Sequence, residues 1–177
     1  IVHGLTSLHD WAGQTTAEQL QHDHWTHHRR LKLAFETVTA IKSKGLYRPF
    51  PEPELVFKSL YERHRQLIDT PLPYLPERDI FELFLTYGVS VTYHRLRSAH
   101  SRMKHSLIQG FTGIVDYRIE PPTRSLKRLA QREPPAQTVI DRYEDLTCLL
   151  NYLAHSGFYL GVGVKTAQGM GMMRVIS

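Results

Sequence analysis

The stretch that decides the fold is Gly161-Val162-Gly163-Val164-Lys165-Thr166-Ala167-Gln168-Gly169-Met170-Gly171-Met172-Met173-Arg174-Val175, near the end of a chain of 177 residues. Because glycine has no Cβ, this backbone can adopt positive φ and approach a bulky anion closely, which predicts a loop that contacts phosphates. A tight turn without a ligand is the alternative interpretation. Nucleotide-binding glycine motifs require a strand before the glycines and a helix after them. Here the predicted order is a helix, the glycine loop and a terminal strand over 172–176, which argues against those motifs.

Apolar periodicity predicts the elements that precede the loop. Period-two alternation indicates half-buried strands, and apolar residues at helical spacing indicate core-facing helices. The predicted elements are a strand over 29–41, a helix that begins at Pro51 and Pro53 with the apolar stripe Val56, Phe57, Leu60, Tyr61, Leu67 and Ile68, strands over 89–93 and 111–119, and a helix whose first turn holds Asp141, Glu144 and Asp145. Because Tyr93 and Tyr117 share the period of their strands, we expect both in the core.

Three further segments surround these elements. Thr15 and Glu18 have the spacing of a capping box, which predicts a short helix over 15–22. Prolines in residues 70–76 end the preceding helix. The pattern of residues 77–84 predicts a short helix, which we interpret as an insertion. The segment 94–105, which carries arginine and lysine residues, is expected to be a basic connection between two strands.

The predicted order is therefore strand, helix, strand, strand, helix, strand. This is the ferredoxin-like, or RRM-like, βαββαβ arrangement of the α+β class, in which two helices cover one face of a four-stranded antiparallel sheet. The other face stays open, and such faces often bind RNA.

Composition narrows the class of partner. A hydrophobic content of 41% indicates a globular chain, folded as one unit or a close pair. Lysine and arginine number 22 against 17 acidic residues, which gives a net charge of +5, and the chain carries 11 histidines. This surface should attract polyanions, more strongly as the pH falls toward the imidazole pKa, and it favours nucleic acid. No stretch approaches the roughly 18 consecutive apolar residues of a membrane helix, so no membrane partner is expected.

The single cysteine and the first residue bear on the cellular context. Cys148 lies in an apolar helical pattern, which predicts a buried thiol and excludes a disulfide within the chain. A reducing compartment, the cytoplasm, is therefore expected. The chain starts at Ile1, which is neither an initiator methionine nor part of a signal peptide, so we expect it to be a piece of a longer protein.

Three segments resemble a known family. The first is Ala154-His155-Ser156-Gly157 followed by Gly161-Val162-Gly163-Val164-Lys165-Thr166-Ala167-Gln168-Gly169-Met170-Gly171; the others lie at 35–60 and 110–118. Together they resemble the CRISPR-associated repeat endoribonucleases of the sixth Cas family, within the RAMP superfamily, over residues 31–175. The resemblance implies that 29–177 is the C-terminal ferredoxin-like RAMP domain, with its glycine-rich loop at 161–171. Residues 1–28 would then be a linker or the remnant of a preceding domain, which in this family usually supplies the catalytic histidine.

The resemblance also implies an activity. Members of this family cleave precursor CRISPR RNA within each repeat, without a metal or other cofactor, by attack of the ribose 2′-hydroxyl that leaves a 2′,3′-cyclic phosphate. The expected partners are CRISPR repeat RNA, subunits of a CRISPR effector complex and a second copy of the chain. A non-catalytic RAMP-type subunit that holds guide RNA is the alternative, and an unrelated enzyme of phosphate ligands is a third reading.

The candidate RNA-binding residues follow from the glycine loop and the basic connection. They are Gly161, Gly163, Lys165, Thr166, Gly169, Gly171, Arg95, Arg97, Arg102 and Lys104. Lysine inside a glycine loop resembles the phosphate-contacting lysines of other loops, and a basic segment beside a sheet suits an RNA stem. The alternative interpretation, without an RNA contact, is that Lys165 is a solvated charge and that the arginines belong to an ordinary soluble surface.

Histidines supply the remaining candidates. His155 lies just before the glycine loop and is a weak catalytic candidate, although a histidine at a helix end more often caps or packs. The cluster His22-Asp23-His24-Trp25-Thr26-His27-His28 contains zinc-type ligands, but it runs into a predicted strand and no distant ligand pair accompanies it. We therefore expect a solvated or interface segment, and no metal site.

Overall fold

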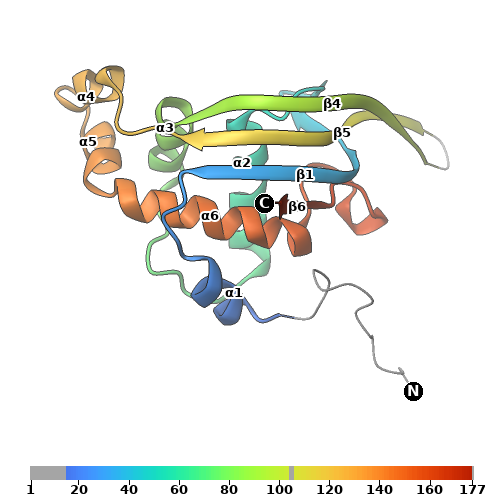
Figure 1. Ribbon diagram of the computed structural model, residues 1–177, viewed down its shortest axis with the longest axis horizontal. Coiled ribbons are helices and arrows are strands. Elements are labelled where there is room, and N and C mark those ends of the chain that lie inside the picture. The colour runs from blue at the N-terminus through green and yellow to red at the C-terminus, as the bar shows by residue number, and fades with distance from the viewer. Residues whose placement is uncertain (1–14, 104–105, 177) are drawn as a thin grey trace.

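The computed structural model describes residues 15–103 and 106–176, and its four main strands form one antiparallel sheet (Figure 1). The strands are β1 (Arg30–Thr39), β4 (Val89–Met103), β5 (Ser106–Ile119) and β6 (Met173–Ile176), in the spatial order β4-β5-β1-β6. Helix α2 (Pro53–Leu67) lies between β1 and β4 in the chain, and α6 (Tyr143–Leu160) lies between β5 and β6. This is the ferredoxin-like βαββαβ arrangement, so the predicted fold class is confirmed.

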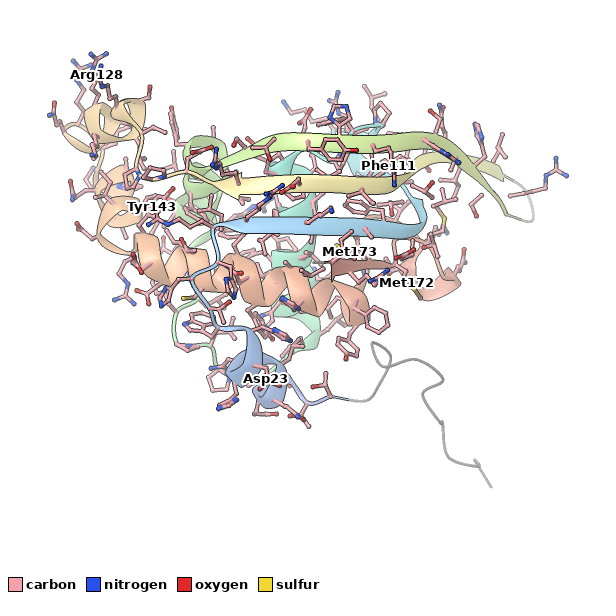
Figure 2. The ribbon with its side chains drawn as sticks, viewed as in Figure 1. Asp23, Phe111, Arg128, Tyr143, Met172 and Met173 are labelled. Atoms are coloured by element: carbon pink, nitrogen blue, oxygen red, sulfur yellow. The ribbon has the colours of Figure 1, made fainter. Side chains whose placement is uncertain are left out.

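The core lies between the sheet and its helices. Leu31, Leu33 and Phe35 are buried at alternate positions of β1, as the period-two pattern predicted. They join one cluster with apolar side chains of α2, α6 and β5. At the start of β6, Met173 is buried, whereas Met172, the residue before the strand, is exposed; both are labelled in Figure 2.

Helix α2 corrects one detail of the predicted apolar stripe. Val56, Phe57, Leu60 and Tyr61 are buried as expected, but Leu67 is 64% exposed. The buried position of the next turn is taken by His64, because the last turn of α2 extends beyond the core. The expectation of Leu67 in the core was therefore wrong.

Helix α3 (Arg78–Gly88) is not an insertion. Phe81, Phe84 and Leu85 are buried in the main core cluster, and the helix packs against α2. It runs four residues beyond the predicted segment and leads directly into β4. The interpretation of this helix as an insertion was therefore wrong. The sequence pattern did not show which elements its apolar face would pack against.

The β4–β5 hairpin is longer than expected. The segment 94–105 was predicted to be a connection, whereas β4 continues to Met103 and pairs with β5 along its length. The pairing register shifts between Val91 and Tyr93, so a bulge at Thr92 reverses the face of every later side chain. Tyr93 is consequently 50% exposed and its predicted core position was wrong, while Tyr117 is fully buried as predicted.

Helix α1 (Ala17–His24) confirms the predicted N-terminal helix but corrects its cap. The side chain of Thr16, rather than Thr15, accepts the hydrogen bond from the amide of Gln19. The helix packs against α6. Residues 1–14 of the predicted linker lie outside the described residues.

Several short elements had no sequence prediction, among them a 3-10 turn, η1 (Thr166–Gln168), within the glycine loop. Four others lie outside the loop. They are the hairpin strands β2 (Ile41–Ser43) and β3 (Leu46–Arg48), and the helices α4 (Arg124–Ala130) and α5 (Pro134–Asp141). Thr123 caps α4, and Pro134 occupies the first turn of α5, where its missing amide proton costs nothing. Within the described residues, the helices are all too short or too polar to cross a membrane.

Candidate nucleic-acid interface

The glycine loop is attached to the end of β1 by its backbone. Helix α6 ends at Leu160, and the positive φ of 68° at the next residue, Gly161, turns the chain out of the helix. The amide of Val162 then donates to the carbonyl of Gly171 at 2.8 Å, which closes the loop on itself. The amides of Val164 and Gly171 donate to Ala40 and Val38 at 2.9 and 3.0 Å. The loop therefore has a fixed shape before any ligand binds.

The glycines are required by close approach as well as by φ. Gly163 and Gly171 have φ of 81° and 73°. A Cβ at Gly163 would overlap the carbonyl oxygen of Ala40, and one at Gly171 would overlap that of Val162. Gly169 also has φ of 81°, but nothing lies within 4 Å of its Cβ position. Its requirement for glycine is conformational alone.

Most of the loop amides are already used within the chain. We expected the amides of 161–171 to face RNA, yet those of Gly161, Gly163, Gly169 and Gly171 each donate to a described partner. The three consecutive amides of residues 165–167 donate to none of the described residues. They belong to Lys165, which is exposed, and to the two residues that follow it, so the unused amides are confined to the apex of the loop. RNA contact by this loop stays a prediction.

Two side chains of helix α2 hold the loop by hydrogen bonds to Gly163. The guanidinium of Arg63 donates to the carbonyl of Gly163 at 2.6 Å, and the hydroxyl of Ser59 accepts the amide of the same glycine at 3.0 Å. Burial lowers the pKa of Arg63. The sequence pattern placed Arg63 off the apolar stripe of this helix and gave it no role. The spacing of Ser59 and Arg63, four residues apart on one helix face, was the available signal.

The basic residues of the β4–β5 hairpin divide between its two faces. Arg95 and Arg97 are exposed and lie two residues apart in a strand of regular register, so they project from the same face. Arg102 is also exposed but lies an odd number of residues away, on the opposite face. Lys104 lies outside the described residues. The structure therefore brings Arg95 and Arg97 together and separates them from Arg102.

The open face of the sheet adds cations that the sequence did not single out. The register pairs Arg30 with Arg118, and Lys32 with Asp116, on the side away from the helices. Asp116 is only 1% exposed and accepts hydrogen bonds from Arg30 at 3.0 Å and 2.5 Å. These bonds raise the pKa of Arg30. The carboxylate fixes the arginine over the sheet.

The bulge in β4 places Tyr93 on this same face, since Tyr93 pairs with Asp116. A cavity of about 250 Å³ lies there, lined by Arg30, Thr92, Tyr93 and Arg118. An exposed tyrosine among arginines offers a surface for a base and its phosphate. The sequence could not reveal it, because a bulge changes the period without a distinctive residue.

His155 packs rather than standing free beside the loop. Its ring stacks on that of His24 with centroids 3.6 Å apart and an interplanar angle of 4°. Burial, together with smaller contributions from the neighbouring His24 and His28, lowers the pKa of His155 to about 4. The contact connects α1 to α6. A catalytic role of His155 stays a prediction.

Two further histidines of the 22–28 segment, His27 and His28, also contact α6. The ring of His27 lies 3.3 Å from the sulfur of Cys148 and 3.2 Å from a carboxylate oxygen of Glu144, and the carbonyl of His28 accepts a bond from Asn151. Burial raises the pKa of Cys148 to about 11, so its thiol stays protonated near neutral pH. Across 15–103 and 106–176 no group of three or more His, Cys, Asp or Glu residues could hold a metal ion. The contacts fit an interface segment within the molecule.

Comparison with known proteins identifies one family. The family model described as CRISPR-associated endoribonuclease Cas6 matches residues 33–173, from β1 to β6. A CRISPR-associated endoribonuclease Cas6 of Streptococcus thermophilus is 27% identical over 143 residues, which are 81% of this chain and 49% of that protein. The one of Mycobacterium tuberculosis is 26% identical over 149 residues, which are 83% and 39% of the two proteins. The chain thus spans half the length, or less, of these relatives.

Solved structures show the same likeness. A Cas6 of Thermus thermophilus superimposes with a TM-score of 0.73 at 25% identity, covering 95% of this chain and 61% of that one. A Cas6 product complex gives a TM-score of 0.72 at 28% identity and covers 98% and 61%.

Proposed function

The chain belongs to the family of CRISPR-associated endoribonuclease Cas6, and on that premise we propose that the protein binds precursor CRISPR RNA and cleaves it within each repeat. The observation that carries the proposal is a family match that begins in β1, ends in β6 and includes the whole glycine loop. The basic balance of the chain, 22 cations against 17 carboxylates, is consistent with an RNA partner.

Two regions of this chain would hold the RNA. Lys165 and Thr166, with the free amides at the loop apex, would contact the backbone of the strand, and Gly161, Gly163, Gly169 and Gly171 would shape that apex. Arg95 and Arg97 would contact phosphates of the repeat from one face of the β4–β5 hairpin. Arg102, on the other face, and Lys104 would contact a different segment of the same RNA.

The reaction we propose is attack of a ribose 2′-hydroxyl on the adjacent phosphorus. The 2′-oxygen loses its proton and bonds to phosphorus, the bond to the 5′-oxygen breaks, and that oxygen gains a proton. A 2′,3′-cyclic phosphate and a 5′-hydroxyl result, with no metal taking part. The phosphorane carries an extra negative charge, which the ammonium group of Lys165 would stabilise.

His155 is the candidate for proton transfer that the sequence indicated. At neutral pH its lowered pKa keeps the imidazole uncharged, so the ring can accept a proton. The stack on His24 restricts its approach to RNA. We therefore give His155 a smaller part in this proposal than the cations. A His155→Phe variant, which keeps an aromatic ring but cannot transfer a proton, separates its catalytic role from its packing role.

The test is a cleavage assay on the intact protein with a repeat RNA in the presence of EDTA. We expect one cut per repeat and a product mass that corresponds to a cyclic phosphate. A 2′-deoxy substitution at the nucleotide before the cut should abolish cleavage while binding persists. Cleavage that requires a divalent metal, or that survives the deoxy substitution, would contradict the mechanism.

The packed position of His155 favours a second candidate function. If proton transfer is absent, the protein would be a non-catalytic RAMP-type subunit that holds guide RNA within an effector complex. Such a protein would bind repeat RNA with the same cations and leave it uncut in the same assay.

A further inference from the structure

A cavity of about 480 Å³ lies beside the glycine loop, between α2 and the short β2–β3 hairpin. Its apolar wall contains Ile41, Leu55 and Val164, and its polar rim contains Lys42, Ser43 and Lys44. Because Gly163 and Val164 belong to both the loop and the cavity wall, the two sites form one continuous surface. The volume lies within the range of about 300–1,000 Å³ that is typical of small-molecule sites.

The charges around this cavity favour an anion. Lys42 and Lys44 are exposed, and no carboxylate of the described residues lies within ion-pair distance of either ammonium group. Lys58 lines the cavity as well, but it is paired with Glu82 at 2.5 Å. Glu62 is the acidic member of the lining, and Arg78 lies 3.4 Å from it. The unpaired charge at the rim is therefore positive.

The backbone of Lys44 is held in an unfavourable conformation. Lys44 and Gly45 form the two-residue turn between β2 and β3, with φ of 51° and 80°. Such turns favour Asn-Gly or Gly-Gly, since a residue with a Cβ is strained at positive φ. Lys44 and Lys165 are the non-glycine residues of the described chain with positive φ; Lys44 lines the cavity, and Lys165 directly follows Val164 of its wall. Strained backbone positions cluster at binding sites, so the conformation of Lys44 is consistent with a role for its side chain.

We propose that this cavity binds one unstacked nucleotide of the RNA strand that passes the glycine loop. Its phosphates would contact Lys42 and Lys44, and its base would lie against Ile41, Leu55 and Val164. The apolar wall distinguishes a nucleotide from a bare anion, and continuity with the loop favours RNA over an acidic peptide. The inference rests on the proposed function, because the strand must first be RNA.

The turn itself supplies the sharpest test. Lys44→Gly removes the charge and also relieves the strain, so the variant should bind repeat RNA more weakly while its thermal midpoint stays equal or rises. The salt dependence of RNA binding should become shallower by about one unit in log–log slope. Lys127→Ala, an exposed lysine on α4, is the matched control and should leave binding unchanged.

The outcomes separate this inference from the proposed function. If the intact protein binds repeat RNA and Lys44→Gly binds it with unchanged affinity and slope, the cavity inference is overturned while the proposed function stands. If the intact protein binds no repeat RNA at all, the proposed function fails first.

A second measurement identifies the ligand by NMR of the methyl groups of Leu55 and Val164. Titration with uridine or adenosine monophosphate should shift both, and inorganic phosphate should not. Equal shifts with inorganic phosphate would reduce the site to an anion site, and no shift with any nucleotide would overturn the nucleotide pocket. Shifts caused only by an acidic peptide would assign the cavity to a protein partner, against the inference.

Discussion

The glycine loop and the β4–β5 hairpin were both predicted to contact RNA, but their construction differs. The loop is hydrogen-bonded to the carbonyls of Val38, in β1, and Ala40, just after β1. It is also hydrogen-bonded to the side chains of Ser59 and Arg63 in α2. The distal part of the hairpin pairs mainly with itself and exposes its arginines to solvent. Glycines in the loop therefore serve the fold, and cations on either region are available for binding. Substitutions in the two regions should affect different quantities.

The largest effect is expected from Gly171→Ala in the loop. The added methyl would overlap the carbonyl of Val162 at a positive φ, which should lower the free energy of unfolding by about 3 kcal/mol. Gly169→Ala is the matched control, because its Cβ would meet open space and cost only about 1 kcal/mol of strain. Urea denaturation measures both, and equal costs would show that the loop is not closely packed.

The hairpin should respond in the opposite way. Arg95→Ala combined with Arg97→Ala should leave the free energy of unfolding within about 0.5 kcal/mol, because both side chains are exposed. The same double variant should weaken repeat RNA binding about tenfold or more, with a slope against salt that is shallower by about two units.

The control for this variant is Arg128→Ala. Figure 2 shows Arg128 at the end of the molecule opposite the end of β4 and the start of β5. Its removal should change neither the affinity nor the slope. Similar losses in the double variant and in the control would assign RNA binding to overall charge instead of the hairpin.

The sequence predicted the order of the elements better than the contacts of individual side chains. The order of strands and helices could be predicted because apolar periodicity follows directly from which face is buried. Tyr93 was misplaced because one extra residue at Thr92 reverses the period, and no residue type announces a bulge. The use of the loop amides could not be predicted, since their acceptors at Val38 and Ala40 lie far away in sequence. Lys44, Arg63 and Arg30 were missed because a charge alone does not reveal its surroundings.

The scaffold that both regions share should weaken in acid. Burial lowers the pKa of His24, His64 and His155, the last to about 4 from an ordinary value of 6.5. The unfolded chain therefore binds protons more readily than the folded one between those values. Stability should be full above about pH 6.5 and should decline as the pH falls toward about 4, with the thermal midpoint lower by about 5 °C at pH 5 than at pH 7.

Thermal melts of a His155→Phe variant measure the share of that residue. Phenylalanine keeps the aromatic contact with His24 and cannot be protonated, so the decline with pH should be smaller than in the unaltered chain. His22→Phe, at an exposed position, should follow the unaltered chain. An identical decline in the His155 variant would exclude this residue as a source of acid sensitivity.

The smallest effect is expected at the loop apex, where one substitution should change both stability and RNA binding. Lys165→Gly should relieve the strain of a φ of 60° and raise the free energy of unfolding by up to about 1 kcal/mol. It should also weaken RNA binding severalfold and make the salt slope shallower by about one unit. A loss of stability together with unchanged binding would reverse the assignment of this lysine.

The most direct test is to map ultraviolet cross-links between repeat RNA and the intact protein by mass spectrometry. We expect cross-linked peptides from the loop apex around Lys165 and from the β4 segment that holds Arg95 and Arg97. Cross-links confined to the surface of α4 and α5, with none at the loop or the hairpin, would contradict it.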